Sequence, residues 1–291
     1  MGAIGYYIAL PFLYGIAFLP FPALYLLSDL VFFLLFHIIG YRKQVVLTNL
    51  RNSFPEKSEA ELHAIMKRFY RWFCDLTLET LKTLTIRPEE VRRRVSFPGA
   101  GVFKAFVEQK QSVIIVMGHY GNWELAGARF AVEPGIHPLI VIYHPLQNPH
   151  FEKLIVQMRT RLGNRLYAMA ETFKGMVRDR QLLTATAFIA DQTPAPERAY
   201  WTTFLNQDTP VFTGTGVIAK KLGYPVIYIS IHQPRRGYYE MGAEVLVDDP
   251  RSMSEIDINQ VHTKRLERDI RQKPDLWLWT HRRWKHKRPH A

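Results

Sequence analysis

The sequence predicts an α/β fold in which a mixed, mostly parallel sheet is flanked by helices and preceded by an N-terminal membrane-inserted helical segment. The first observation is that apolar, β-branched runs alternate with helical periodicity from residue 111 onward, as in a parallel sheet with crossover helices. The second is an apolar N-terminal block, which has no Lys or Arg before Arg42 and a single acidic residue, Asp29. We therefore expect an anchor over residues 1–41 and an α/β domain over residues 42–291.

The N-terminal block is long enough to cross a bilayer, for which about 20 apolar residues suffice. Three prolines interrupt it, so we expect one spanning or deeply inserted helix followed by an interfacial helix over residues 23–39. A cleavable signal peptide is not expected, because the positively charged start is missing. Arg42 and Lys43 follow at once, and the positive-inside rule then predicts that the rest of the chain faces the cytoplasm. A hydrophobic subdomain of a soluble protein is the alternative.

Helical and extended stretches follow one another through the second part. Ser58 and Glu61 form a capping-box pattern, so a long amphipathic helix begins there. The strand that ends at Gly118 is strongly apolar, since residues 113–115 are consecutive β-branched residues. The other expected helices cover residues 102–108, 123–132, 149–162, 214–222 and 254–272, and the other expected strands cover residues 138–143, 183–190, 225–231 and 239–247. The last strand returns from a turn and is expected to be antiparallel and near an edge.

The composition restricts the possible partners. A formal net charge of +12 favours a negatively charged partner, which could be nucleic acid, an anionic membrane surface or an acidic carrier protein. Cys74 is the only cysteine, which excludes an intramolecular disulfide and a cysteine-ligated metal. None of the histidines belongs to a metalloprotease-type pair, so no metal site is expected.

A histidine stands directly after the apolar strand that ends at Gly118. In open α/β sheets, sites lie at the carboxyl ends of the strands, and His119 occupies that joint. Glu124 falls five residues later in the first turn of the next helix, from which a carboxylate could fold back and orient the imidazole as a general base. Gly121 allows close approach of backbone or substrate, and the indole of Trp123 could pack against a long apolar ligand. A loop histidine that only satisfies backbone groups is the alternative.

Four other segments accompany this joint: a helix that carries Arg159 and Arg161, the Asp191-Gln192 pair at the end of a strand, a glycine-rich helix start at residues 213–216, and an aromatic, basic terminus at residues 277–285. Together with residues 46–55 and the His119 block, they resemble the lipid A biosynthesis acyltransferases, the lauroyl and myristoyl transferases, within the lysophospholipid acyltransferase fold. The resemblance covers nearly the whole chain.

The resemblance implies transfer of an acyl chain from acyl carrier protein, or alternatively acyl-CoA, to a hydroxyl of a lipid A precursor. His119 is the implied general base, oriented by Glu124, and Asp191 is expected to hold Arg159 in a buried pair. The candidates for the oxyanion site or for substrate positioning are Arg159, Asp191, Gln192, Gly121 and Asn122. The candidates for contact with the substrate or the membrane are Trp123, Arg161, Trp279, Arg282, Arg283 and Trp284, of which the last four are expected to form an interfacial belt.

The implied partners are acyl carrier protein, a lipid acceptor and the anionic face of the cell inner membrane, with the catalytic domain on the cytoplasmic side. No cofactor, no metal and no nucleic acid is expected. Residues 193–196 and 201–204 depart from the family's usual pattern, so an acceptor that is another glycolipid, a phospholipid or an aminolipid is an open alternative. A non-catalytic membrane-surface protein or a nucleic-acid-binding protein is the second alternative.

Overall fold

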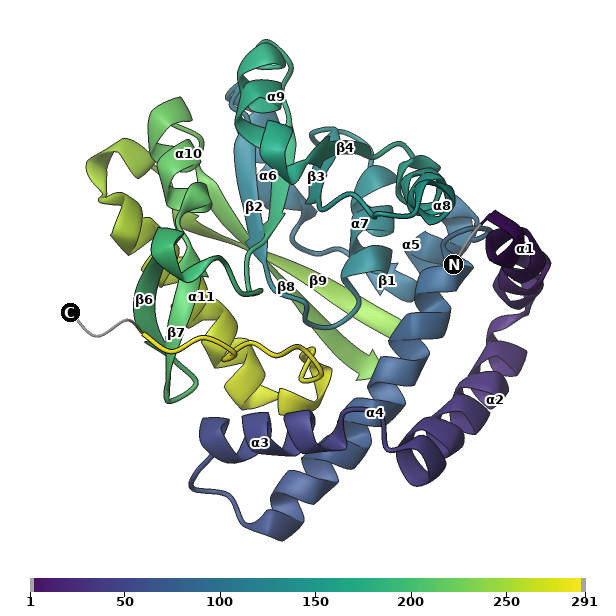
Figure 1. Ribbon diagram of the computed structural model, residues 1–291. Helices are drawn as coiled ribbons and strands as arrows, with labels where there is room; N and C mark the ends of the chain where they lie inside the picture. The colour runs from purple at the N-terminus through teal and green to yellow at the C-terminus, as the bar shows by residue number, and fades with distance from the viewer. Residues whose placement is uncertain (1–2, 289–291) are drawn as a thin grey trace.

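The computed structural model describes residues 3–288, apart from the side chains of Ala3, Ile4 and Arg198, and centres on a seven-stranded sheet (Figure 1). The strand order is β1-β9-β8-β2-β5-β3-β4. Only β8 and β9 are antiparallel, whereas every other neighbouring pair is parallel. The strands are β1 (Val95–Ser96), β2 (Val113–Met117), β3 (Leu139–Tyr143), β4 (Arg165–Ala168), β5 (Ala185–Ile189), β8 (Val226–Arg235) and β9 (Tyr238–Val247). The predicted mixed, mostly parallel α/β sheet is confirmed.

Helices cover both faces of the sheet, which is why β2 reads as a continuous apolar run. On one face lie α5 (Pro88–Arg94), α6 (Ala100–Glu108) and α7 (Trp123–Ala131). On the other lie α3 (Lys43–Ser53), α4 (Glu59–Lys82), α9 (Thr172–Arg178), α10 (Gly214–Leu222) and α11 (Glu255–Gln272). Helix α8 (Pro149–Thr160) connects β3 to β4. The predicted capping box of α4 is present, with Ser58 and Glu61 bonded to each other's backbone N–H groups.

The N-terminal residues form α1 (Ala3–Phe18), α2 (Phe21–Phe32) and a π-helical continuation (Phe33–Ile39), which line one side of the molecule (purple in Figure 1). By length and composition, the stretch Phe21–Ile39 qualifies as a candidate membrane span, while Gly5–Phe18 is a shorter apolar helix. The expected order, in which the first helix spans and the second is interfacial, stays a prediction. Pro20 and Pro22 lie at the start of α2, where proline is tolerated because it falls in the first helical turn.

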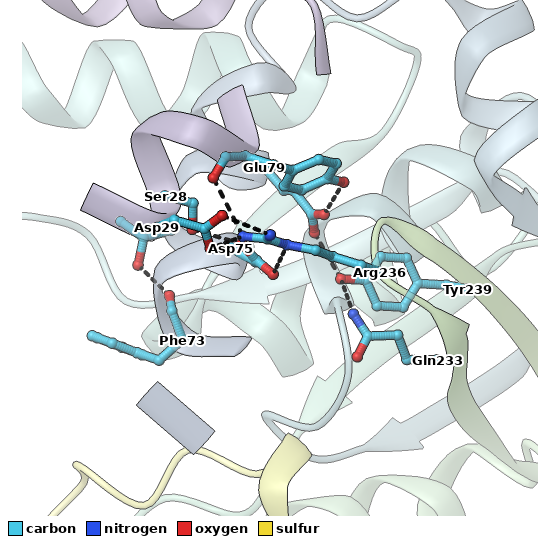
Figure 2. Close-up of polar contacts among 10 residues, drawn as sticks. Ser28, Asp29, Phe73, Asp75, Glu79, Gln233, Arg236 and Tyr239 are labelled. Carbon is cyan, nitrogen blue, oxygen red and sulfur yellow. Dashed lines mark hydrogen bonds and ion pairs between the residues drawn. The ribbon is translucent and has the colours of Figure 1, made fainter. Parts of the chain in front are cut away.

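Helix α2 is bonded to the rest of the molecule by a charge cluster that joins the buried Asp75 to the exposed Asp29 and Arg236, which Figure 2 shows in close-up. Arg236, from the turn between β8 and β9, donates to Asp75 of α4 through Nε at 2.8 Å and Nη2 at 2.7 Å. The same guanidinium reaches Asp29 of α2 at 2.7 Å, and Ser28 donates to Asp75 at 2.6 Å. These contacts make α2 a docked element of the fold, because they tie it to α4 and to the sheet at one point.

A small hairpin and the C-terminal segment complete the fold. Strands β6 (Ala199–Phe204) and β7 (Gln207–Phe212) pair antiparallel apart from the main sheet. Short 3-10 turns occur at Met169–Glu171, Pro196–Arg198, Pro250–Ser252 and Pro274–Leu276. After the last of these, the chain runs back past β7 (yellow in Figure 1) and packs against the turn that follows β2.

Candidate active site

His119 and Asp191 form a hydrogen-bonded pair at the carboxyl edge of the sheet. His119 lies between β2 and α7, and its Nδ1 is 2.6 Å from Oδ1 of Asp191. The backbone N–H of His119 donates to Oδ2 of Asp191 at 2.9 Å. Nε1 of Trp277, from the C-terminal segment, donates to the same Oδ2 at 2.7 Å. One carboxylate therefore fixes both the backbone and the ring of His119.

The protonation of this pair follows from its surroundings. Burial of Asp191 by itself would raise the pKa of the carboxyl, but the adjacent imidazole and the donors from His119 and Trp277 outweigh it and lower the pKa to about 2. An ionised carboxylate only accepts hydrogen bonds, so Nδ1 carries the hydrogen of the neutral imidazole. The lone pair is then on Nε2, which lies 3.4 Å from the side-chain nitrogen of Gln192. The ring is thus oriented as a proton acceptor.

The carboxylate that orients His119 is not the predicted one. Glu124 points from the first turn of α7 toward α8, where it forms a two-fold ion pair with Arg159 at 2.5 Å and 3.2 Å. The expected contacts of Glu124 with His119 and of Asp191 with Arg159 are therefore both wrong. The reason is the sheet register: Met117 of β2 pairs with Ile189 of β5, so the residues two positions further along each strand leave the sheet side by side.

A cleft of about 310 Å³ opens beside this pair. Its polar lining residues are Thr83, His119, Glu124, Tyr143, His144, Arg159, Asn164 and Gln192. The other walls are mostly apolar and include Trp123, Val141, Ile142, Ile155, Met158, Leu162, Met169 and Ile189. Burial would lower the pKa of Arg159, but the charge of Glu124 raises it, and Arg159 stays charged in the cleft. The arrangement suits a ligand that combines a long apolar part with a polar reacting group.

Comparison with known proteins shows the family to which this chain belongs. A family model described as "Bacterial lipid A biosynthesis acyltransferase" matches residues 2–286. The chain belongs to this family. It is accordingly an acyltransferase of the lipid A biosynthesis type, and membership decides against the alternative of a non-catalytic membrane-surface or nucleic-acid-binding protein.

Curated relatives of this acyltransferase agree at low identity. The chain is 24% identical over 273 residues to "Lipid A biosynthesis lauroyltransferase" of Escherichia coli (strain K12), a match that covers 92% of this chain and 87% of the relative. It is 23% identical over 271 residues to "Lipid A biosynthesis palmitoleoyltransferase" of the same strain, covering 92% and 86%. A match to the "Lipid A biosynthesis myristoyltransferase" of that strain is 25% identical over 159 residues, covering 54% and 48%.

Trp123 lies where the sequence predicts a ligand contact in the acyltransferase. Its ring centroid is 4.9 Å from that of His119 in an edge-to-face arrangement, and its indole lines the cleft. On its other side it packs against Trp72 of α4. Trp123 therefore forms an apolar wall directly beside the imidazole.

Gly121 and Asn122, expected to position the substrate, have structural roles in the acyltransferase. The N–H of Gly121 donates to Leu276 O at 2.9 Å, so it is not available to an oxyanion. Gly121 has a φ of +63°, and a Cβ there would lie 2.5 Å from a side-chain atom of Ile231. Asn122 is buried, caps α7 by accepting from Leu125 N, and donates to Glu79 at 2.6 Å. Both predictions fail because the turn's polar groups are used to hold the turn itself.

Arg161 is also structural. Its guanidinium donates to the backbone oxygens of Thr83 and Ile86, which join the end of α8 to the end of α4. It does not line the cleft, whereas Arg159, two residues earlier, does. Two of its nitrogens satisfy carbonyls at and beyond the C-terminus of α4, while the predicted contact of Arg161 with substrate or membrane stays a prediction.

The predicted interfacial belt at the C-terminus is largely buried. Trp279 is fully buried and donates to Pro274 O at 2.6 Å, and Trp284 donates to Thr209 at 2.7 Å. Arg283 is 2% exposed. Only Arg282 is exposed as expected. The tail packs inward because its backbone bonds to the turn after β2, where Leu278 N donates to His119 O at 3.2 Å.

Trp277 is the functional residue that the sequence analysis did not identify. It was grouped with the aromatic tail, yet it supplies a hydrogen bond to Asp191 and a backbone bridge to Tyr120. An aromatic residue 86 positions from its carboxylate partner leaves no local pattern that could reveal the contact.

Proposed function

We propose that the protein transfers a fatty acyl chain from a thioester donor to a hydroxyl of a lipid A precursor, with His119 as the general base. The observation that carries this proposal is the orientation of the imidazole, whose Nδ1 is held by Asp191 while Nε2 is on the side of the cleft lined by Gln192. A base held in this way contributes about 10²–10⁴ to a rate.

The proposed reaction needs no nucleophile from the protein, because the lipid hydroxyl supplies it. As the hydroxyl oxygen forms a bond with the thioester carbon, Nε2 of His119 takes the hydroxyl proton. The ionised Asp191 stabilises the imidazolium that results. The carbon–sulfur bond then breaks, and the imidazolium returns the proton to the leaving thiolate. The ester and the free thiol are the products, and His119 ends neutral.

The tetrahedral oxyanion requires donors on the cleft wall. Arg159 and Gln192 both line the cleft with His119, and we assign them this role. Glu124 then acts on Arg159 instead of His119: its two hydrogen bonds set the direction of the guanidinium and leave part of it facing the cleft. Glu124 is therefore a positioning residue in this mechanism.

The apolar cleft and the net charge of the protein support the choice of acyl chain and of donor. The relatives carry names that specify lauroyl, palmitoleoyl and myristoyl groups, all linear acyl chains, and a mostly apolar cleft suits such a chain. A net charge of +12 favours acyl carrier protein over acyl-CoA as the donor, because an acidic protein offers many contacts to a basic surface. Acyl-CoA is the alternative donor.

We place the protein at the cell inner membrane with its catalytic domain on the cytoplasmic face. The apolar stretch Phe21–Ile39 and the exposed apolar side chains of α1, such as Phe12 at 70% exposure, support membrane insertion. Arg42 and Lys43 follow that stretch and support the cytoplasmic assignment. The division into an anchor up to residue 41 and a domain from residue 42 stays a prediction.

The second candidate acceptor is another glycolipid, a phospholipid or an aminolipid. It is favoured by residues 193–196, which depart from the family's usual pattern next to Gln192. The Thr193 hydroxyl donates to Arg283 O at 2.8 Å and bonds to His281, so the segment that departs from the family pattern packs against the C-terminal tail beside the site. The same base would serve any of these hydroxyl or amino groups.

Mass spectrometry of lipids tests the function and identifies the acceptor in one experiment. Cells with and without the gene are compared, and the gene is restored as wild type, as His119→Gln, or as His63→Gln. We expect one lipid to lose an acyl chain without the gene and to regain it with wild type and with His63→Gln, since His63 is an exposed residue of α4 that does not line the cleft. His119→Gln should not restore it. Full restoration by His119→Gln would refute the mechanism, and an unchanged lipid A fraction would refute the acceptor.

A further inference from the structure

Arg283 is a buried cation with unused hydrogen-bonding capacity. It is 2% exposed and lies in the tail that packs against the active-site turn. Nη2 donates to Pro210 O at 2.6 Å, which ties the tail to β7. Nε and Nη1 are buried and have no protein partner in the described part of the chain. Since a charge in the interior is normally paired or hydrogen-bonded, a further partner for this guanidinium is expected.

A small cavity lies between Arg283 and Asp191. Both residues line it, and its volume of about 10 Å³ is the size of one water molecule. Its remaining walls come from the ends of β2 and β5, from Tyr228 of β8, from the hairpin and from α11. No described residue lines both this cavity and the substrate cleft. Asp191 lines the cavity and bonds to His119, so Asp191 is the link between the cavity and the catalytic imidazole.

The other polar groups of this cavity already have partners. The Tyr228 hydroxyl donates to Asp269 at 2.8 Å, and the Thr263 hydroxyl donates to Asn259 O at 2.7 Å. Asp191 differs, because its two oxygens offer about four acceptor positions and three are used, two of them at Oδ2. Oδ1 therefore keeps one acceptor position, and Arg283 keeps the donors that match it.

We propose that Arg283 is a positioning residue of the catalytic site, and that it acts on Asp191 through one water molecule held in this cavity. The water accepts from the guanidinium and donates to Oδ1 of Asp191. Burial lowers the pKa of Arg283 to about 10, and the charge of Asp191 opposes that shift, so the two groups interact across the cavity. This inference rests on the proposed function, since it assigns Arg283 a part in setting the basicity of His119.

The chemical consequence concerns the return of the proton. Asp191 with three donors and no counter-charge would stabilise the imidazolium so strongly that His119 would release its proton slowly to the leaving thiolate. A cation behind Asp191 offsets part of this stabilisation. The other titratable or charged groups that face this site are Glu124, Tyr143, His144, Arg159, Tyr228, His262, His281 and Lys285. Glu124 and Arg159 neutralise each other, and burial lowers the pKa of His262 to about 4, so it stays neutral.

The test measures how the His119 ring titrates when Arg283 is changed. The full-length protein in detergent micelles, with ¹⁵N-labelled histidine, is followed by NMR, and His119 is assigned by the signal lost in His119→Gln. Arg283→Gln removes the charge but keeps an N–H group for Pro210 O. We expect the titration midpoint of His119 to move up by about one pH unit, as for one charge removed about 10 Å away at an effective dielectric of about 20. The acid limb of the pH–rate profile should move by the same amount.

Two variants control for structure. Arg282→Gln removes an exposed positive charge from the adjacent position and should leave the midpoint where it is in wild type. Arg283→Lys keeps the charge and should restore the wild-type midpoint. A midpoint that is the same in Arg283→Gln and wild type would overturn the proposal, as would a shift of equal size in Arg282→Gln.

The water is tested without any substitution. In wild-type protein, a nuclear Overhauser effect between the water resonance and Hε of Arg283 is expected, and its absence would overturn the bridge even if Arg283→Gln fails to fold. Failure of the proposed function is a different result: wild type would then transfer no acyl chain, while the His119 titration in Arg283→Gln would still show whether the two side chains are coupled.

Discussion

Replacement of Asp191 by Asn should cost far more in turnover than replacement of Glu124 by Gln. Asp191→Asn keeps the shape of the side chain but removes the charge that faces the 2.6 Å contact with Nδ1 of His119. A hydrogen bond to a charged group contributes about 1.5–3 kcal/mol. An amide can also present its N–H₂ to Nδ1 and favour the wrong tautomer, with the lone pair directed away from the substrate. Together we expect kcat to fall about 10²–10⁴-fold.

Glu124→Gln is the matched control, because the two carboxylates lie in one site and the substitutions are equivalent. It leaves the His119–Asp191 pair intact and removes only the charged partner of Arg159. We expect kcat to fall about tenfold, roughly 1.4 kcal/mol in the barrier, with no change in the pH dependence. The assay is steady-state transfer from a thioester donor, with kcat and KM determined separately over a range of pH.

The relative loss of kcat in the two variants decides which carboxylate orients His119. A larger loss of kcat in Glu124→Gln than in Asp191→Asn would mean that the carboxylates exchange partners when substrate binds, and our assignment of the base-orienting residue would be refuted. Equal losses would show that the four side chains act as one network. In both variants the thermal unfolding midpoint must be measured, because Asp191 is buried and its loss also affects stability.

Three more predictions concern stability and the third donor to Asp191. Burial raises the pKa of Glu79 to about 7, so the protonated carboxyl stabilises the fold fully below about pH 4.5, and this stabilisation is lost as the pH rises through 7. Glu79→Gln should abolish this loss of about 3 kcal/mol in the free energy of unfolding. A pH dependence of denaturant unfolding that is the same in Glu79→Gln and wild type would contradict this prediction. Gly121→Ala should lower the free energy of unfolding by about 2–4 kcal/mol, because the left-handed φ and the contact with Ile231 both oppose a Cβ; wild-type stability would show that the turn can relax. Trp277→Phe should lower kcat about tenfold by removing one donor to Asp191, with KM nearly constant, and a purely KM effect would place Trp277 in substrate binding instead.

The strand, the turn and the helix around His119 could be predicted from the sequence because each has a local pattern. The helix over residues 214–222 and the capping box at Ser58 coincide with the structure for the same reason. The partner of His119 could not be predicted, since both Glu124 and Asp191 stand at plausible distances along the chain. The choice depends on β5 lying next to β2, and strand order is a long-range property.

The C-terminal tail shows a different limit of sequence-based prediction. Tryptophans interleaved with arginines are typical of a membrane interface, and the same composition also suits a segment that packs inward with its polar atoms satisfied. Here backbone hydrogen bonds hold the tail against the turn after β2. Trp279 and Arg283 are therefore buried in the protein, and Arg282 is exposed to solvent. Short elements without periodicity, such as β1, β4 and the β6–β7 hairpin, were not predicted either.

The contact between Trp277 and Asp191 has a consequence for the order in which the protein is made. During synthesis α2 leaves the ribosome before α4, and Tyr25 of α2 can bond to Glu79 as soon as α4 follows. His119 and Asp191 appear later, and Trp277 emerges only after both of them. A nascent chain would therefore lack the third donor to Asp191 until long after its sheet has been synthesised, and an enzyme that modifies lipids would stay inactive during that interval.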